Sequence, residues 1–379
     1  MMKKRIDELK APQNILMIGL FLAFLLSHVV HTYFAGMMFT FTEFSKILIM
    51  YFLFVLIIDS EKKLKITIYL LIFLTFLLAL QGIYQYNTGY GWAGQPIIRH
   101  TYEGVESLRI TWLSIFNDPN DLGLAFVIGL ALLIGLFFGK TNLISKIFIL
   151  PIAGCIMYAL YLTNSRGAYL AFMVMVFFYF VRRSKIKLLG PLIGAGLVFL
   201  IFIFGPSRLA YMSTDGDSAY NRVDAWYYGV QLTKANPIFG IGYGMFMDDY
   251  GMTAHNTFVL AMTEAGLLGL FFLVGLFYIS FKGLSLIQKH NMRMRNYTYG
   301  LQGTLIGFTA SAFFLSRLYI PIPYILFALS ASLVNVNSAN LSLPHNVSVN
   351  RLTMRDLRNI GLATTGIVAM FYAIVKITL

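Results

Sequence analysis

The chain has 379 residues, of which 58% are hydrophobic and only 12% are charged. Soluble globular proteins carry roughly 25% charged residues, so this composition excludes an ordinary soluble domain. The apolar residues fall in blocks of about 18–22, the length that spans a bilayer as a helix. The formal net charge is +13, but the basic residues gather in short loops between apolar blocks. That pattern is typical of membrane topology and argues against a nucleic-acid partner.

In chain order the hydropathy predicts an all-α polytopic membrane protein, because alternating strand-length segments of a barrel are absent from the pattern. We expect the whole chain, 1–379, to form a single integral membrane domain. The eleven predicted spans are 13–34, 38–59, 66–86, 121–138, 143–163, 167–181, 188–205, 256–281, 298–315, 320–337 and 359–377.

The charges predict the orientation. With the N-terminus in the cytoplasm, twenty of the 29 basic residues fall in inner segments, as the positive-inside rule expects. Seven fall outside, and six of these are arginine. Arginine is the better planar, bidentate partner for phosphate oxygens, so the outer face hints at a phosphate-bearing ligand. Anchoring of helix ends and pairing with carboxylates explain the same arginines equally well.

Two predicted outer segments are long, 87–120 and 206–255. Long loops on a compact bundle are where function usually concentrates. We expect the loop 206–255, which lies on the extracytoplasmic side, to carry the active site.

The end of that loop holds the strongest local feature. Residues 236–244 read Asn-Pro-Ile-Phe-Gly-Ile-Gly-Tyr-Gly, and His255 follows where the chain enters the next predicted span. Alternating glycines permit close approach of a substrate, and a neutral imidazole can accept the proton of an attacking hydroxyl. The alternative is a histidine that merely caps the helix. Gly266, eleven residues on, is predicted to lie on the same helix face and to open room below the histidine.

Three outer arginines are candidates for diphosphate binding: Arg166 in the Asn-Ser-Arg-Gly turn, Arg222 beside aromatic residues, and Arg317 in a short turn. Residues 118–121, Asp-Pro-Asn-Asp, read mainly as an ordinary helix start, with sugar binding by Asn120 or Asp121 as the alternative. Candidate glycan-binding residues are Tyr243, Asn256 and Trp226, although interfacial aromatic belts look the same.

Further ionisable residues are expected to be structural. His28 and His31 are predicted to anchor the membrane interface, because further metal ligands are not evident near them. Glu264 and the Glu43–Lys46 pair are predicted to make structural pairs inside the membrane. By helical angle Glu264 points away from His255. The single cysteine, Cys155, cannot form an intrachain disulfide or a cysteine-based metal site.

The order of these motifs resembles the bacterial O-antigen ligase and O-antigen polymerase superfamily over about residues 110–280. The Asp-Pro-Asn helix start, the Ser-Arg-Gly turn and the stretch 236–269 carry the resemblance. It implies a helical bundle similar to GT-C glycosyltransferases, with eleven to twelve membrane helices in the bacterial inner membrane and an active site on the periplasmic face. It also implies a metal-independent, inverting transfer from a polyprenyl-diphosphate-linked glycan, without a cofactor.

In this resemblance His255 serves as general base or positions the acceptor, and Arg166 and Arg222 match the diphosphate-binding arginines, with Arg317 a weaker match. The acceptor is a hydroxyl of lipid A-core, a protein or a glycan. A ligase is narrowly favoured over a polymerase, which would join lipid-linked repeat units. A flippase for the same lipid and a non-catalytic membrane scaffold are hypotheses of a different class. The sequence shows few of the repeats and paired midplane charges of transporters and places its polar residues outside, which argues against the flippase.

Overall fold

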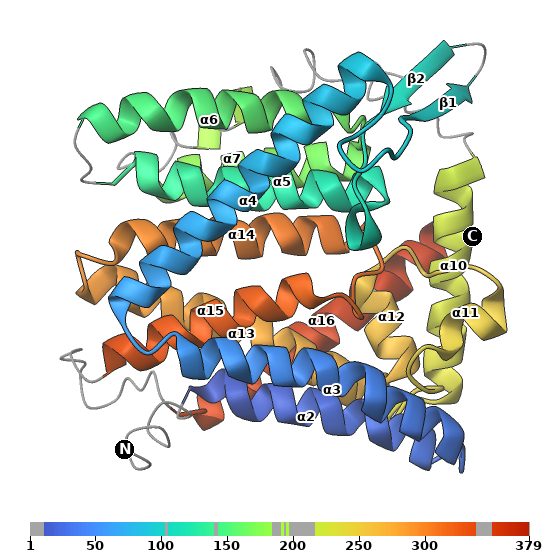
Figure 1. Ribbon diagram of the computed structural model, residues 1–379. Helices are drawn as coiled ribbons and strands as arrows, with labels where there is room; N and C mark the ends of the chain where they lie inside the picture. The colour runs from blue at the N-terminus through green and yellow to red at the C-terminus, as the bar shows by residue number, and fades with distance from the viewer. Residues whose placement is uncertain are drawn as a thin grey trace. The chain divides into compact units, whose positions relative to one another are not determined.

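The computed structural model describes residues 11–102, 105–139, 143–183, 191–192, 195–196, 217–338 and 351–378. Within these residues it contains thirteen α-helices, one short 3-10 helix and one two-stranded hairpin (Figure 1). The predicted fold class, an all-α polytopic membrane protein, is confirmed. The elements are α2 Pro12–Val29, α3 Phe34–Ile57, α4 Glu61–Thr88, β1 Ile98–Tyr102, β2 Val105–Arg109, η1 Ser114–Phe116, α5 Pro119–Phe137, α6 Leu143–Leu162, α7 Arg166–Arg183, α10 Asp217–Ala235, α11 Met245–Tyr250, α12 Thr257–Glu264, α13 Gly266–His290, α14 Arg295–Ala312, α15 Pro321–Ser338 and α16 Met354–Thr378.

Six of the described helices are long and apolar enough to cross a bilayer: α2, α3, α4, α5, α13 and α16. Shorter apolar helices, Lys146–Leu162 and Pro321–Asn337, coincide with two further predicted spans. The predicted spans 167–181 and 298–315 are helical as α7 and α14. The predicted span 188–205 falls almost entirely outside the described residues.

The predicted span 256–281 needs correction. It is two helices, because α12 ends at Glu264 and α13 begins at Gly266, whose φ is +65°. That left-handed backbone suits glycine and interrupts the helical ladder. The predicted alignment of Gly266 with His255 on one helix face is therefore wrong.

The chain forms two compact units. Unit 1 comprises residues 1–64, 214–292 and 312–379. In it α2 and α3 lie side by side and pack against α13 and α15 (Figure 1). Gly19 of α2 lets the ring of Phe272 approach its backbone, since a Cβ there would overlap that ring.

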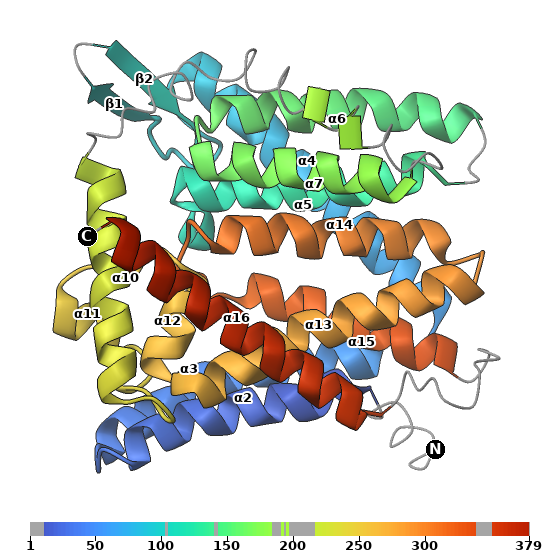
Figure 2. The same ribbon diagram turned by 180° about the vertical axis from the view of Figure 1, so that it is seen from behind.

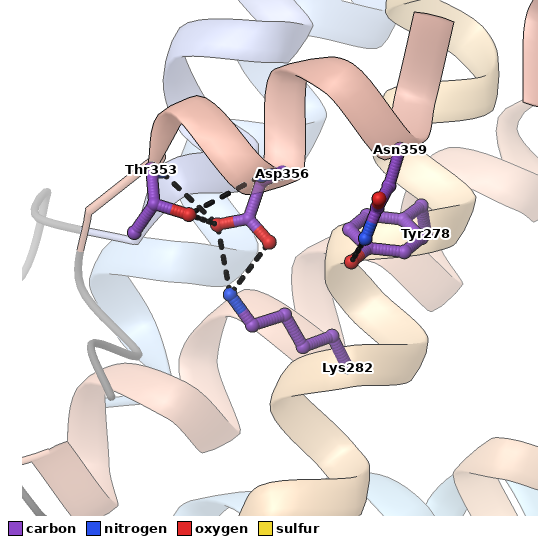
Figure 3. A network of polar contacts seen from close by, with 5 residues as sticks. All are labelled: Tyr278, Lys282, Thr353, Asp356 and Asn359. Atoms are coloured by element: carbon purple, nitrogen blue, oxygen red, sulfur yellow. Dashed lines mark hydrogen bonds and ion pairs between the residues drawn. The ribbon is translucent and has the colours of Figure 1, made fainter. Parts of the chain in front are cut away.

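The C-terminal helix α16 is bonded near its start to α13, within unit 1. Asp356 accepts hydrogen bonds from Lys282 Nζ at 2.7 and 2.8 Å and from Thr353, and Asn359 donates to the Tyr278 hydroxyl (Figure 3). The helix then runs along α13 towards α10 (Figure 2). Most of this apolar helix is not buried, as expected of a helix facing lipid.

Unit 2 comprises residues 65–213 and 293–311. In it α5 packs against both α6 and α7, and α14 lies beside α5 (Figure 2). Gly135 of α5 lies directly against the Gly300 backbone of α14. The buried Tyr179 of α7 donates a hydrogen bond to Ala131 O at 2.9 Å and lies 3.0 Å from Tyr299 O, so one hydroxyl joins three helices.

Candidate functional site

His255 lies between α11 and α12 in an unusual backbone conformation. Its φ is +49°, and its side chain is half-buried. A non-glycine residue in the left-handed region is uncommon and persists only where its surroundings hold it. On one side the Trp226 indole of α10 donates to Ala254 O at 3.0 Å. On the other side Asn256 caps α12, its Oδ1 accepting from Phe258 N and Val259 N. His255 is thus not the helix cap, and the backbone that presents it is held on both sides.

The start of α12 also holds the turn that bears Arg317. We call residues 313–319 the Arg317 turn. Asn256 Nδ2 donates to Phe313 O at 3.1 Å, and Thr257 Oγ1 donates to Leu315 O at 2.6 Å. The Arg317 backbone N–H donates in return to Thr257 Oγ1 at 2.9 Å. Because Thr257 is only two residues from His255, the structure brings the backbones of His255 and Arg317 together.

The glycine-rich loop, residues 236–244, is held against the break between α12 and α13. Ile241 N donates to Thr263 O at 2.9 Å and Gly242 N donates to Glu264 O at 3.0 Å. Leu267 N donates back to Pro237 O at 2.8 Å. A side chain at Gly240 would overlap the Glu264 carbonyl, so this close backbone approach requires glycine.

The side chain of Glu264 is fully buried within unit 1 and faces hydrogen-bond donors. Its Oε2 accepts from Gly244 N at 2.8 Å and from the Tyr319 hydroxyl, and its Oε1 accepts from Phe246 N at 3.2 Å. The carboxylate therefore joins the glycine-rich loop to the end of the Arg317 turn. A buried carboxylate needs such bonds, because its desolvation is costly.

The end of α2 holds the other side of the glycine-rich loop. His28 Nε2 lies 3.1 Å from Tyr243 O, and His31 Nε2 lies 2.8 Å from Gly240 O. Ser27 Oγ accepts from Tyr243 N at 3.2 Å. The two histidines were predicted to anchor the membrane interface, whereas the structure uses both to hold this loop. His28 lies in the last turn of α2 and His31 in the turn directly after it, and this closeness in sequence is the signal that could have indicated a shared partner.

The predicted glycan-binding residues differ in how accessible they are. Asn256 is fully buried and its amide is engaged with α12 and Phe313, so the structure gives it a positioning role. Tyr243 is 6% exposed, with its ring packed edge-on against Phe24 and Tyr319, which also favours packing. Trp226 is half-buried and packs edge-on against Phe371 of α16 at 5.4 Å, and its indole supports the His255 backbone.

Helices α10 and α11 carry two tyrosine–aspartate pairs next to this region. Tyr228 donates to Asp249 at 2.9 Å, and Tyr250 donates to Asp224. The bond to Asp249 raises the pKa of Tyr228, while burial and the bond to Asp224 raise the pKa of Tyr250 to about 12. Both hydroxyls stay protonated at neutral pH and act as donors, which leaves the base role to another group. Arg222 lies on α10 one turn before Trp226, with a half-buried side chain.

The predicted Arg166 lies in unit 2, at the first residue of α7. The preceding Ser165 accepts from Ala168 N at 3.2 Å as a helix cap and donates to Asn120 Oδ1 at 2.7 Å. The buried Arg109 at the end of β2 donates to the same Asn120 oxygen at 3.3 Å and to Thr163 O at 3.1 Å.

The two motifs around residues 118–121 and 164–167 therefore meet, with Arg109 between them. Asn120 supports the turn before Arg166, as a helix-start residue whose amide reaches a neighbouring loop. Because Arg166 and Arg317 belong to different units, the predicted convergence of Arg166, Arg222 and Arg317 on one diphosphate stays a prediction.

Sequence reasoning did not assign Glu264, Tyr319 and Arg109 to the site. The helical angle placed Glu264 away from His255, but that angle assumed that His255 belongs to the helix, whereas α12 begins at Thr257. Tyr319 and Arg109 carry no local motif, and only the fold shows their partners. Among the described residues, no group of three or more His, Cys, Asp or Glu side chains gathers as a metal site.

The fold and the site define a multi-pass helical membrane protein whose polar residues gather where its helices end. Residues 151–274 match the model of the O-antigen ligase family. The match confirms the resemblance to the O-antigen ligase and polymerase superfamily that the motifs predicted. The family indicates O-antigen ligase-type glycan transfer in surface polysaccharide assembly. No curated protein matches the chain.

Proposed function

We propose that the protein transfers a glycan from a polyprenyl-diphosphate-linked donor to a hydroxyl acceptor, on the extracytoplasmic face of the bacterial inner membrane. Acceptors in this class are lipid A-core, a protein or another glycan, and a ligase is favoured over a polymerase. The orientation follows the charge asymmetry of the sequence, with the N-terminus in the cytoplasm.

The observation that carries this proposal is the support around His255. A histidine in a left-handed conformation is held by Trp226 on one side and by the Asn256 cap on the other. The two residues that follow His255, Asn256 and Thr257, bond to the Arg317 turn. An imidazole and a guanidinium on adjoining, well-held backbone suit a reaction that removes a proton and releases an anion.

In the proposed reaction the acceptor oxygen attacks the anomeric carbon of the donor glycan. The bond from that carbon to the diphosphate oxygen breaks, its electron pair leaves with the diphosphate, and the configuration inverts. The His255 imidazole takes the acceptor proton. Arg317 and Arg222, together with Arg166 as the family resemblance implies, stabilise the negative charge that develops on the leaving diphosphate. Arginines in this role would allow the transfer to proceed without a metal.

The test uses purified full-length protein in detergent or nanodiscs, with polyprenyl-diphosphate-linked glycan and candidate acceptors. His255→Asn removes the base but keeps a residue that tolerates the left-handed backbone. We expect it to lower transfer at least about a hundredfold, the usual contribution of a general base. His290→Ala, an exposed histidine at the end of α13, is the matched control and keeps full activity.

Arginine variants test the diphosphate role in the same assay. We expect Arg317→Ala, Arg222→Ala and Arg166→Ala each to lower transfer about tenfold or more, whereas Arg355→Ala on the exposed face of α16 has no effect. Full activity of His255→Asn would overturn the base assignment. Loss of activity in a chelator, restored by added metal, would overturn the metal-independent mechanism. Lipid movement without a new glycosidic bond would indicate a flippase instead.

A further inference from the structure

Helix α12 holds the Arg317 turn at both of its ends. At its start, Asn256 and Thr257 bond to Phe313, Leu315 and the Arg317 backbone. At its end, Glu264 accepts a hydrogen bond from the Tyr319 hydroxyl. Arg317 lies between these two attachments. Since α12 is only eight residues long, the turn is fastened along the whole helix.

The same Glu264 carboxylate holds the glycine-rich loop. It accepts from the backbone N–H groups of Gly244 and Phe246, while the Glu264 carbonyl accepts from Gly242 N. Glu264, Tyr319 and the residues of the glycine-rich loop all lie in unit 1. One carboxyl group thus receives donors from two segments more than sixty residues apart in sequence.

We propose that Glu264 and Tyr319 are positioning residues for the diphosphate site, which set the place of Arg317 relative to the glycine-rich loop. This assignment rests on the proposed function. The fully buried Glu264 bonds the Tyr319 hydroxyl at the end of the Arg317 turn and acts on Arg317 through that turn. Phosphate recognition by arginine is directional and bidentate, so a loosened turn lowers affinity even when Arg317 itself is intact.

The chemistry of the cluster favours this role over simple packing. Both carboxyl oxygens face donors, so the loss of one bond leaves a buried polar atom without its partner, which costs more than a lost packing contact. The Tyr319 ring packs edge-on against Tyr243 at 4.6 Å, which leaves its hydroxyl pointed at Glu264. Tyr324 bonds Leu318 O at 2.7 Å and supports the same turn from α15.

The test measures binding of farnesyl diphosphate, a short polyprenyl diphosphate, to the full-length protein by calorimetry. Tyr319→Phe removes one hydroxyl and keeps the ring, and we expect it to weaken binding about tenfold. Glu264→Gln places an amide N–H₂ opposite a backbone donor, and we expect a larger loss. In the Arg317→Ala background, Tyr319→Phe should cause no further loss, because the two changes act through the same contact.

Matched controls come from a second polar network, which joins α13 to α16 (Figure 3). Tyr278→Phe removes a hydroxyl bonded to Asn359, and Asp356→Asn weakens the ion pair to Lys282. Both should change thermal stability and leave the dissociation constant for farnesyl diphosphate unchanged.

The outcomes separate this assignment from the proposed function. Unchanged binding in Arg317→Ala would overturn the diphosphate role and with it this assignment. Weaker binding in Arg317→Ala but wild-type binding in Tyr319→Phe and Glu264→Gln would overturn the positioning role alone. Additive losses in the double variant Arg317→Ala, Tyr319→Phe would also overturn it, because independent effects add. Tyr319→Phe keeps the test decisive if Glu264→Gln does not fold.

Discussion

Each unit has a short turn that bears a candidate diphosphate-binding arginine, and in each an asparagine next to a helix start holds that turn. In unit 1, Asn256 caps α12 and donates to Phe313 O of the Arg317 turn. In unit 2, Asn120 in the first turn of α5 accepts from Ser165, which directly precedes Arg166.

The two turns differ in what else holds them. In the Arg317 turn Phe313, Leu315 and Arg317 all use main-chain atoms, and the Tyr319 hydroxyl adds one side-chain bond, to Glu264. The turn before Arg166 depends on side chains, with Ser165 and the buried Arg109 sharing the Asn120 oxygen. Main-chain bonds tolerate substitution in the turn, whereas a side-chain network fails when one member changes. We therefore expect unit 2 to be sensitive at more positions of its turn.

The largest effect should come from Gly266→Ala. The φ of +65° disfavours alanine, and its Cβ would overlap the Ile238 carbonyl of the glycine-rich loop. We expect loss of the α12–α13 break, with poor folding yield and no measurable transfer. Gly361→Ala, where α16 leaves open space, is the control and should leave the melting temperature unchanged or slightly raised. Wild-type yield and activity in Gly266→Ala would show that the break is not needed.

Arg109→Lys should have the next largest effect. Lysine cannot reproduce the two differently directed bonds to Thr163 O and Asn120 Oδ1. We expect about 2 kcal/mol of lost stability, estimated from one charge-assisted bond, together with weaker transfer through displacement of Arg166. Thermal unfolding in detergent measures the first and the glycan-transfer assay the second. If Arg109→Lys behaves as wild type, the side-chain network does not hold the turn.

Asn256→Ser should have the smallest effect on stability. Serine also caps helices well, so the variant loses mainly the bond to Phe313 O, at a cost of about 1 kcal/mol. Transfer should fall several-fold more than Asn120→Ser lowers it, since Asn256 adjoins both His255 and Arg317. Equal losses of transfer in the two variants would show that the adjacency of Asn256 to His255 and Arg317 gives it no larger role than Asn120 has.

Much of the fold was predictable because each membrane helix is a continuous apolar segment that can be recognised from its residues alone. The apolar blocks at 13–34, 38–59, 66–86 and 121–138 correspond to α2, α3, α4 and α5 within several residues. The cap of α5 was also predicted: Asp118 accepts from Asn120 N, with Pro119 at the first helical position. These features depend only on residues close together in the chain, so they can be predicted from the sequence.

The break between α12 and α13 was missed because Glu-Ala-Gly lies within a continuous apolar block. Hydropathy predicts which segments are buried in the membrane, but it does not predict the φ angle of a single glycine. That angle follows from contact with Ile238 and Phe239, which come from the glycine-rich loop. The roles of Glu264, His28 and His31 were missed for the same reason, since each acts on a loop distant in sequence.

The sequence by itself determined the class of protein, the approximate membrane segments, the family motifs and the candidate residues His255, Arg166, Arg222 and Arg317. These follow from local composition and residue order, through the cost of placing polar groups in a bilayer. Only the tertiary structure decided which segments meet: the Arg317 turn with α12, the glycine-rich loop with Glu264, and Arg109 with Asn120. Hydrogen bonds between distant segments arise only when the chain has folded, because buried polar groups must find partners wherever packing places them.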